Sequence, residues 1–457
     1  MATTAEALAR ALDSGAAQEA FGREASVFSE AARKSAAGGS SEVLRPWLNM
    51  QAVNLARHAA ALRPFRKDEF GTTASAPTPG HIEAANKLLS GLRRSLLKHS
   101  KHVRTLARQA CDDPTMAALQ AVVNHKEKGH HWVQGIEKIW DFYFELFGQR
   151  QSRYANWLLS CDRIALDCYR TAYLGLGTAR SIPAPPPFCY MRTGFSPATF
   201  RRGIPLKRLG KQLNPFPLVE LPYHRMVNPW TLGAVLHEVS HNLQSDLGLS
   251  KDVPRQVALR LLKAGMERKV AMQWARWNRE MFADMSALLL GGPEVAGSLM
   301  DVVGRGVGVV GSYHAGGVHP TPYLRMPITV ELLRRMGFKS EAERYGNAWK
   351  RIYPKSASGS IPPAIVRTFP KACALAVDAM CFRPYPSLGN KSLAQAIAFG
   401  DKEQKMIDEA AGRLANGTDP GIIPERFTIG AARIALRRGL AKPGVITHNF
   451  YKALASG

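Results

Sequence analysis

The sequence is poor in acidic residues and in cysteine, and it lacks long apolar runs. Its 457 residues carry 36 acidic side chains against 61 lysines and arginines, which gives a formal net charge of +25. The most apolar long window, from Ala283 to Val303, is interrupted by Asp284, Glu294 and Asp301. A transmembrane helix needs about 20 consecutive apolar residues. The sequence therefore predicts no membrane-spanning segment and an excess of positive surface charge.

The six cysteines are scattered along the chain, and none belongs to a Cys-x-x-Cys pair. This usage is typical of reduced, structural thiols. The first ten residues contain no basic start followed by an apolar run, so they show no secretory signal. We expect a cytoplasmic protein, and export without a signal stays open. The length is sufficient for two or more domains.

The most informative segment reads His237-Glu238-Val239-Ser240-His241. Two histidines four residues apart lie on one face of a helix, so both ring nitrogens can reach one metal ion. The glutamate beside the first histidine then points to the open side of that ion, where it can take a proton from a metal-bound water. The segment predicts a zinc-dependent hydrolase. The alternative is an ordinary core helix with two hydrogen-bonded histidines.

The residues around this motif favour a buried helix with a defined start. Asn228 is of a type favoured at a helix N-cap, and Pro229 fits the first helical position. Apolar residues recur at helical spacing and predict a side that faces the core: Leu232, Val235, Leu236, Val239 and Leu243. Gly248 follows closely and can end the helix.

A catalytic zinc ion needs a third protein ligand. The metzincin pattern would place glycine and histidine soon after the second histidine, but Gln244 and Leu247 occupy those positions. A second predicted helix, at 274–293, carries Glu280 and Asp284 on one face, one turn apart. Glu280 is the candidate third ligand, and Asp284 can accept a hydrogen bond from the far ring nitrogen of a ligand histidine. The alternative is a solvated acidic face.

The pattern His-Glu-x-x-His, followed on a second helix by Glu-x-x-x-Asp, resembles the gluzincin metallopeptidases. The pair Ala283-Asp284 and the segment HPTPYLR at 319–325 are most similar to the CAAX-prenyl-protease-like branch, which also carries a His-Pro pair and an arginine after its glutamate helix. The resemblance covers about residues 215–337. Members of that branch are often membrane-embedded or carry signal sequences, and this chain departs from them in both respects.

The resemblance implies one zinc ion per chain, held by His237, His241 and Glu280, with water in the fourth position. Zinc lowers the pKa of bound water towards neutrality, so hydroxide is available at physiological pH. Glu238 would accept the proton of that water and later pass it to the leaving amine.

A donor to the developing oxyanion is expected on the segment after the glutamate helix. His319 is the first candidate, although it also fits a loop histidine without a catalytic role. The alternatives are Tyr313, His314 and Tyr323. Arg325 would orient this loop, or pair with Asp284 or Glu280 behind the ligands.

The segment from Pro215 to Pro222 precedes the motif and has a predicted role in substrate binding. Its bordering prolines are typical of an edge strand or an isolated β segment. An edge strand binds an extended peptide by adding a strand, with backbone hydrogen bonds that tolerate many sequences. We expect Val219 and Tyr323 to contact a peptide or protein substrate. The alternative for this segment is an extended connector.

Part of the positive charge is concentrated in one predicted amphipathic helix, at 93–108. Its basic side chains are Arg93, Arg94, Lys98, His99, Lys101, His102, Arg104 and Arg108. Such a face can bind nucleic acid, an anionic lipid surface or an acidic protein. We favour a solvated face. No aromatic residues alternate with the charges, which argues against binding of a single-stranded nucleic acid.

The chain as a whole predicts a mainly α fold of the α+β class, with a zincin-like catalytic core that contains a small edge-strand sheet. The expected regions are an alanine-rich, partly flexible N-terminal region at 1–80, a helical region with the basic helix at 81–182, the zincin-like metallopeptidase core at 183–338 and a helical C-terminal region at 339–457. Further expected features are helical patterns at 81–111 and 116–175, a stiff proline-rich linker at 181–187 and a glycine-rich, flexible active-site loop at 304–317.

The leading hypothesis is a zinc metallopeptidase of gluzincin type. The second is a non-catalytic protein of the zincin fold that binds an anionic partner, such as nucleic acid, an acidic protein or a lipid surface. A third is a zinc-dependent amidase or toxin-like effector that cuts one specific partner. Glu238 separates the first two, because a protein that only binds has no need of a general base. The sequence leaves the oligomeric state open.

Overall fold

The computed structural model describes residues 41–177, 180–205, 212–419 and 421–456. The alanine-rich stretch up to Gly39 lies outside the described residues. The chain is mainly helical with two small sheets. It forms two compact units, whose described residues fall as follows: the first within 1–71, 77–148 and 203–215, and the second within 72–76, 149–202 and 216–457.

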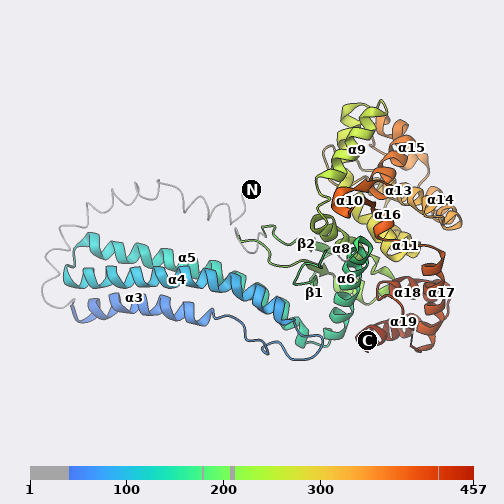
Figure 1. Ribbon diagram of the computed structural model, residues 1–457. Helices are drawn as coiled ribbons and strands as arrows, with labels where there is room; N and C mark the ends of the chain where they lie inside the picture. Colours follow the sequence, from blue (N-terminus) through green and yellow to red (C-terminus); the bar gives the residue numbers. More distant parts are fainter. Residues whose placement is uncertain (1–40, 178–179, 206–211, 420, 457) are drawn as a thin grey trace. The chain divides into compact units, whose positions relative to one another are not determined.

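Long helices make up most of the first unit: α3 (Ser41–Ala61), α4 (Pro79–Asp112) and α5 (Met116–Gly148). They run side by side (Figure 1). The side chain of Thr78 caps α4 by accepting a hydrogen bond from the backbone N–H of His81, and Pro79 lies in the first turn. Leu55 and Val103 belong to the apolar core that the three helices share.

The amphipathic helix predicted at 93–108 is confirmed as part of α4. Val103 is fully buried, while Arg94, Lys101 and Arg104 are exposed. The helical pattern expected to continue from 116 to 175 is interrupted. α5 ends at Gly148, and a 3-10 turn follows, in which the Ser152 hydroxyl donates to the carbonyl of Gln149 at 2.7 Å. A side chain that bonds to the nearby backbone competes with helix continuation.

The second unit contains the remaining helices and both sheets (Figure 1). Its longer helices are α6 (Ala155–Leu176), α8 (Gly233–Asp246), α9 (Asp252–Lys263), α10 (Arg268–Gly291), α11 (Glu294–Val303), α13 (Pro322–Arg335), α14 (Lys339–Ile352), α15 (Pro363–Val377), α17 (Asp401–Asn416), α18 (Phe427–Arg437) and α19 (Pro443–Ser456). Single-turn helices are α7 (Tyr223–Met226), α12 (Val307–Val310) and α16 (Leu393–Ala396). No helix in the described part of the chain is both long enough and apolar enough to cross a membrane.

The helices α8 and α10 pack against each other in the core of this unit. Leu236 and Val239 of α8 and Trp277 and Phe282 of α10 are at most 1% exposed, and all four belong to one apolar cluster. Burying a side chain of this size stabilises the fold by about 1.5–3 kcal/mol. This packing fixes the orientation of both helices about their axes. It therefore also fixes the direction in which their polar faces point.

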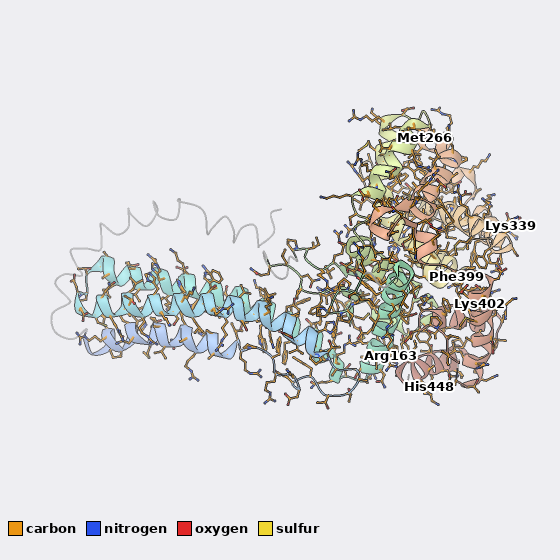
Figure 2. The ribbon with its side chains drawn as sticks, in the orientation of Figure 1. Arg163, Met266, Lys339, Phe399, Lys402 and His448 are labelled. Carbon is orange, nitrogen blue, oxygen red and sulfur yellow. The ribbon has the colours of Figure 1, made fainter. Side chains whose placement is uncertain are left out.

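Glycines let these helices approach their neighbours closely. A Cβ atom at Gly233, where α8 begins, would lie 2.6 Å from the Cβ of Ser298 in α11. Gly292, which follows α10, has a φ of +74°, and a Cβ there would lie 2.1 Å from the ring of Phe399, which Figure 2 labels. Only glycine fits such a position without displacing its surroundings.

The larger sheet has the strand order β1-β3-β2. β1 (Phe188–Met191) pairs in parallel with β3 (Leu218–Leu221), and β2 (Ala198–Phe200) pairs with the other side of β3 in antiparallel. The predicted edge strand at 215–222 is therefore wrong, since β3 is the central strand. Its prolines lie just outside the paired residues, so every backbone N–H of β3 remains available for pairing. The smaller sheet joins β4 (Pro384–Tyr385) and β5 (Lys391–Ser392).

Candidate metal centre

The His-Glu-x-x-His segment lies in α8. Asn228 and Pro229 take the cap and first positions of a short 3-10 turn, Pro229–Thr231, rather than of α8 itself. The predicted side-chain cap at Asn228 is wrong, because its amide donates back to the carbonyl of His224. Gly248 has a φ of +74° and lies just beyond the end of α8, where the sequence places it.

The polar face of α8 faces α10. Glu238 and His241 are buried, with residue exposures of 8% and 6%, and the His237 side chain is 16% exposed. On α10, Glu280 and Asp284 are also buried, with residue exposures of 7% and 8%. The alternative of a solvated acidic face is wrong, because both carboxylates point into the protein.

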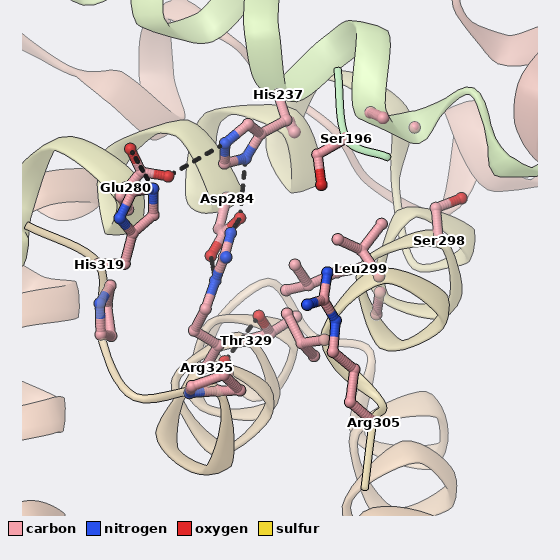
Figure 3. A pocket seen from close by; sticks show the side chains of 18 of the residues that line it. Ser196, His237, Glu280, Asp284, Ser298, Leu299, Arg305, His319, Arg325 and Thr329 are labelled. Atoms are coloured by element: carbon pink, nitrogen blue, oxygen red, sulfur yellow. Dashed lines mark hydrogen bonds and ion pairs between the residues drawn. The ribbon is translucent and has the colours of Figure 1, made fainter. Parts of the chain in front are cut away.

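Three of these side chains converge. Nε2 of His237 lies 3.4 Å from Oε2 of Glu280, and Nε2 of His241 lies 3.5 Å from Oε1 of the same carboxylate. One donor atom from each residue lies within 4.8 Å of the others. Figure 3 shows the His237 ring facing Glu280. The structure thus brings together the residues that the sequence puts forward as ligands.

Their spacing fits three ligands around one ion. Ligands bound at about 2.0–2.1 Å to a tetrahedral ion lie about 3.3 Å from one another. The distances of 3.4 and 3.5 Å from the Nε2 atoms of His237 and His241 to Glu280 match this separation. They are long for N–H···O hydrogen bonds. Two imidazoles and one carboxylate also form a donor set that catalytic zinc uses.

Asp284 and Arg325 lie behind the first histidine. Nδ1 of His237 lies 2.8 Å from Oδ1 of Asp284. Arg325 donates two hydrogen bonds to the same carboxylate, from Nε at 2.8 Å and from Nη2 at 2.6 Å. This arrangement places the proton of His237 on Nδ1 and leaves Nε2 free to bind a metal. Of the two acidic partners proposed for Arg325, the structure selects Asp284.

The side chains of this cluster differ in pKa, because each is affected differently by burial and by neighbouring charges. Burial disfavours the charged form of His237, but hydrogen bonds to Asp284 and Glu280 outweigh it and raise the pKa of His237 to about 10. Burial, followed by the nearby charge of His237, lowers the pKa of His241 to about 3. Burial opposes ionisation of Glu280, yet the hydrogen bond from His237 and the charge of His241 lower its pKa to about 2. A metal ion would therefore displace the proton from His237.

Glu238 differs from the other acidic groups of the cluster. Burial raises the pKa of Glu238 to about 7, and the charge of His237 opposes this only in part. The carboxylate lines a cavity and makes no hydrogen bond to any residue that the structure describes. A general base works best when its pKa lies near the operating pH.

A cavity of about 600 Å³ opens beside the cluster. His237, Glu238, Glu280 and His319 line its polar end. Its other walls come from α10, α11, α13 and the segment after α11, and their apolar members include Leu288, Val295, Leu299, Val303 and Val309. The apolar stretch from Ala283 to Val303 is the one feature of the sequence that indicates this wall.

The glycine-rich segment at 304–317 contributes to the cavity. Arg305, Val309 and His314 line it, and α12 forms within the segment. Gln273 and Arg276 of α10 donate hydrogen bonds to the carbonyls of residues 317 and 316. α10 therefore carries the predicted ligand Glu280 and also holds the end of this segment.

The candidates for an oxyanion donor are placed differently. Nε2 of His319 lies 3.4 Å from Oε1 of Glu280, and the His319 side chain is 65% exposed. His314 lines the cavity as well. Tyr313 donates instead to Gln273, and neither Tyr313 nor Tyr323 is among the described residues that line the cavity.

The two residues expected to contact substrate lie elsewhere. Val219 is fully buried in the middle of the sheet, so its predicted role is wrong. Tyr323 packs against the apolar core, and its backbone carbonyl accepts a hydrogen bond from Trp349. Ser196 and Pro197, which the sequence did not single out, line the cavity just before β2.

Comparison of the chain with models of protein families, with curated proteins and with solved structures finds no match. What the chain does must therefore be inferred from the chemistry of its own residues.

Proposed function

We propose that the chain is a zinc-dependent metallopeptidase of gluzincin type, with one zinc ion per chain. The observation that carries the proposal is the convergence of His237, His241 and Glu280 at the end of a cavity that Glu238 also lines. In an ordinary core helix, the ring nitrogens of buried histidines would have hydrogen-bond partners. Here the buried Nδ1 of His241 has no hydrogen-bond partner among the described residues, and both Nε2 atoms face one carboxylate.

His237, His241 and Glu280 would hold the ion. A bound zinc ion polarises the substrate carbonyl and makes hydroxide available at neutral pH. Asp284 keeps the His237 ring oriented through its hydrogen bond to Nδ1, and Arg325 keeps Asp284 ionised. Arg325 has this effect because burial opposes ionisation of Asp284, but the charge of Arg325 and then the hydrogen bond with His237 lower its pKa.

Glu238 moves the proton in the proposed reaction. Its carboxylate accepts a proton from the attacking water and passes it to the nitrogen of the leaving amine. His319 lies at the exposed side of Glu280, where its ring can donate a hydrogen bond to the carbonyl oxygen as charge develops there. The walls of the cavity shield the reacting groups from bulk water.

In this proposal β2, rather than β3, binds the extended peptide substrate. Among the described strands, β2 stands at one side of the sheet, next to β3. It follows Ser196 and Pro197 of the cavity lining, and Asn242 of α8 donates to the Thr199 hydroxyl at 2.6 Å. An extended peptide that enters the cavity past Ser196 and Pro197 would lie near the cluster and be held through its backbone.

The metal content of the purified protein tests the proposed ligands. We expect about one zinc per chain in the wild type, and a large loss in His237→Ala and in Glu280→Ala. His448→Ala is the control, because His448 is exposed and lies outside the cluster. Circular dichroism confirms that each variant is folded. Equal zinc in all four proteins would refute the metal centre.

A second experiment tests the general base. Glu238→Gln removes the proton acceptor but none of the ligands, so we expect zinc binding to persist and hydrolysis of a quenched-fluorescent peptide library to fall by roughly a thousandfold. His237→Ala should lose both zinc and hydrolysis. Full hydrolytic activity in Glu238→Gln would contradict the proposed mechanism.

One observation favours a second function, the binding of an anionic partner by the first unit. Arg94, Lys101 and Arg104 of α4 are exposed, and no described carboxylate lies within ion-pair distance of them. Heparin is a suitable polyanion probe. Binding that weakens as salt rises, and that is lost when the three residues are replaced by glutamine, would support this function. This second function would give no role to Glu238 or to the metal centre.

A further inference from the structure

The far side of the cavity carries a positive charge that peptide hydrolysis by itself does not require. Arg305 follows α11 and lines the cavity, and Figure 3 shows its side chain beside Leu299, on the opposite side from His319. The hydroxyl of Tyr353 donates to the backbone carbonyl of Arg305 at 2.6 Å, which holds this residue in place. The Arg305 guanidinium thus forms part of the cavity wall.

A second arginine lies over the same aromatic ring as Arg305. The guanidinium carbon of Arg305 lies 4.4 Å from the centroid of the Phe195 ring, and that of Arg225 lies 5.9 Å from it. Phe195 directly precedes the cavity residues Ser196 and Pro197. Both guanidiniums therefore add positive charge beside Phe195, and like charges repel each other.

Both arginines lack an acidic partner among the described residues. In the part of the chain that the structure describes, no carboxylate lies within ion-pair distance of Arg305 or Arg225, and the nearby Asp301 is engaged by Arg433 at 2.6 Å. Arg225 is buried, and its Nε atom has no hydrogen-bond partner among the described residues. A buried guanidinium nitrogen without a hydrogen-bond partner is costly. Arg305, which lines the cavity, therefore favours an anion there, and Arg225, which is not among the described lining residues, adds positive charge nearby.

The wall between these arginines and the metal centre is apolar. Leu288 and Val303 are buried, and Leu299 is partly buried beside them. Such a wall favours a large apolar side chain over a polar one. The cavity of about 600 Å³ has room for that side chain and for the chain atoms that follow it.

We propose that the protein selects peptides with a bulky apolar side chain next to the cleaved bond and a carboxylate that binds Arg305. A guanidinium group binds a carboxylate through paired hydrogen bonds, so Arg305 gives both affinity and orientation. The carboxylate comes either from an aspartate or glutamate side chain or from the C-terminus of the peptide. This inference rests on the proposed peptidase function and narrows its substrate class.

Matched fluorescent peptides test the inference. Each contains leucine after the scissile bond, followed by glutamate or glutamine, and each is made with a free C-terminal acid or with an amide. We expect kcat/KM to be roughly tenfold higher for peptides with the recognised carboxylate, a difference of about 1.4 kcal/mol. A preference that follows the glutamate assigns the site to side chains, and one that follows the free acid assigns it to chain ends.

Variants connect that preference to the arginines. Arg305→Gln should remove it and Arg305→Glu should reverse it, while Arg305→Lys should retain part of it. Arg351→Gln is the matched control, because Arg351 is exposed on α14, has no ion pair among the described residues and does not line the cavity. A preference that is unchanged in Arg305→Glu would overturn the inference.

Binding to the metal-free protein separates this inference from the proposed function. Fluorescence anisotropy of the same peptides, after zinc is removed with a chelator, should show the same order of affinities and the same loss in Arg305→Gln. If the carboxylate peptides bind in this way but none is cleaved after zinc is restored, the peptidase function fails and the anion site stands. Equal binding of acidic and neutral peptides, or no binding of any of them, overturns the anion site.

Discussion

The imidazole of His237 is hydrogen-bonded to the carboxylate of Asp284 through Nδ1, at 2.8 Å. Arg325 binds the same carboxylate through two further hydrogen bonds, so Asp284 is held from two sides. The side chains of Asp284 and Arg325 are 6% and 11% exposed. Because these contacts hold the ring in one orientation, Nε2 of His237 faces Glu280 and is already placed to bind an ion.

Replacing Asp284 by asparagine should weaken zinc binding without abolishing it. The amide removes the charge that orients His237 and leaves Arg325 without its partner, and the loss of such a group behind a ligand typically costs 10–100-fold in metal affinity. Competition with a chromogenic chelator measures the affinity. Asp378→Asn is the control, because Asp378 also binds arginines but lies outside the centre. An unchanged zinc affinity in Asp284→Asn would show that Asp284 has no such role.

Removal of His319 should slow the reaction while the metal stays bound. In His319→Ala we expect kcat to fall on the order of a hundredfold and KM to change little, since a donor to the oxyanion acts mainly in the transition state. His319→Gln retains a donor and should recover part of the rate. Steady-state kinetics and zinc content measure both effects. A loss of zinc in His319→Ala would instead identify His319 as a ligand.

Alanine at Gly292 should destabilise the second unit. Its φ of +74° disfavours any side chain, and the new Cβ would overlap the ring of Phe399. We expect a loss of roughly 1–3 kcal/mol in the free energy of unfolding, measured by urea denaturation. Gly412→Ala is the control, because nothing lies within 4 Å of a Cβ there and the residue is inside helix α17. That variant should be neutral or slightly stabilised.

The acid stability of the second unit should depend in part on Asp378. Burial opposes ionisation of Asp378, but hydrogen bonds from Arg383 and Arg260 outweigh it and lower its pKa below the usual 3.8. A carboxylate with a lowered pKa in the folded state stabilises the fold above its unfolded pKa, and it loses this effect as the pH falls through the folded pKa. Asp378→Asn should therefore cost roughly 1 kcal/mol at neutral pH.

The same difference should begin to shrink below about pH 4, where Asp378 of the unfolded chain takes up a proton, and it should vanish once the pH falls below the lowered pKa of the folded state. Urea denaturation of both proteins across this pH range measures it. A difference that stays constant down to about pH 3 would contradict the proposed charge pairing.

The sequence could predict the residues of the centre because each pair lies within one helix. His237 and His241, like Glu280 and Asp284, are four residues apart, and the helical repeat alone places them on one face. Neighbouring apolar residues then indicate which face is buried. The mainly helical class follows from the same local periodicity.

Features that depend on distant parts of the chain could not be predicted in this way. The sequence around Val219 shows a short strand, but its place in the sheet depends on partners at 188–191 and 198–200. The convergence of Arg225 and Arg305 on Phe195 likewise joins three separate segments. No local pattern specifies which distant segments meet, because that depends on how the whole core packs.

α8 and α10 carry the proposed chemistry on one side and large core residues such as Leu236 and Trp277 on the other. Warming that loosens this interior would move the ligands apart in the same event. Heat inactivation and melting of the second unit should therefore share one midpoint, with no temperature interval in which a folded but inert protein accumulates.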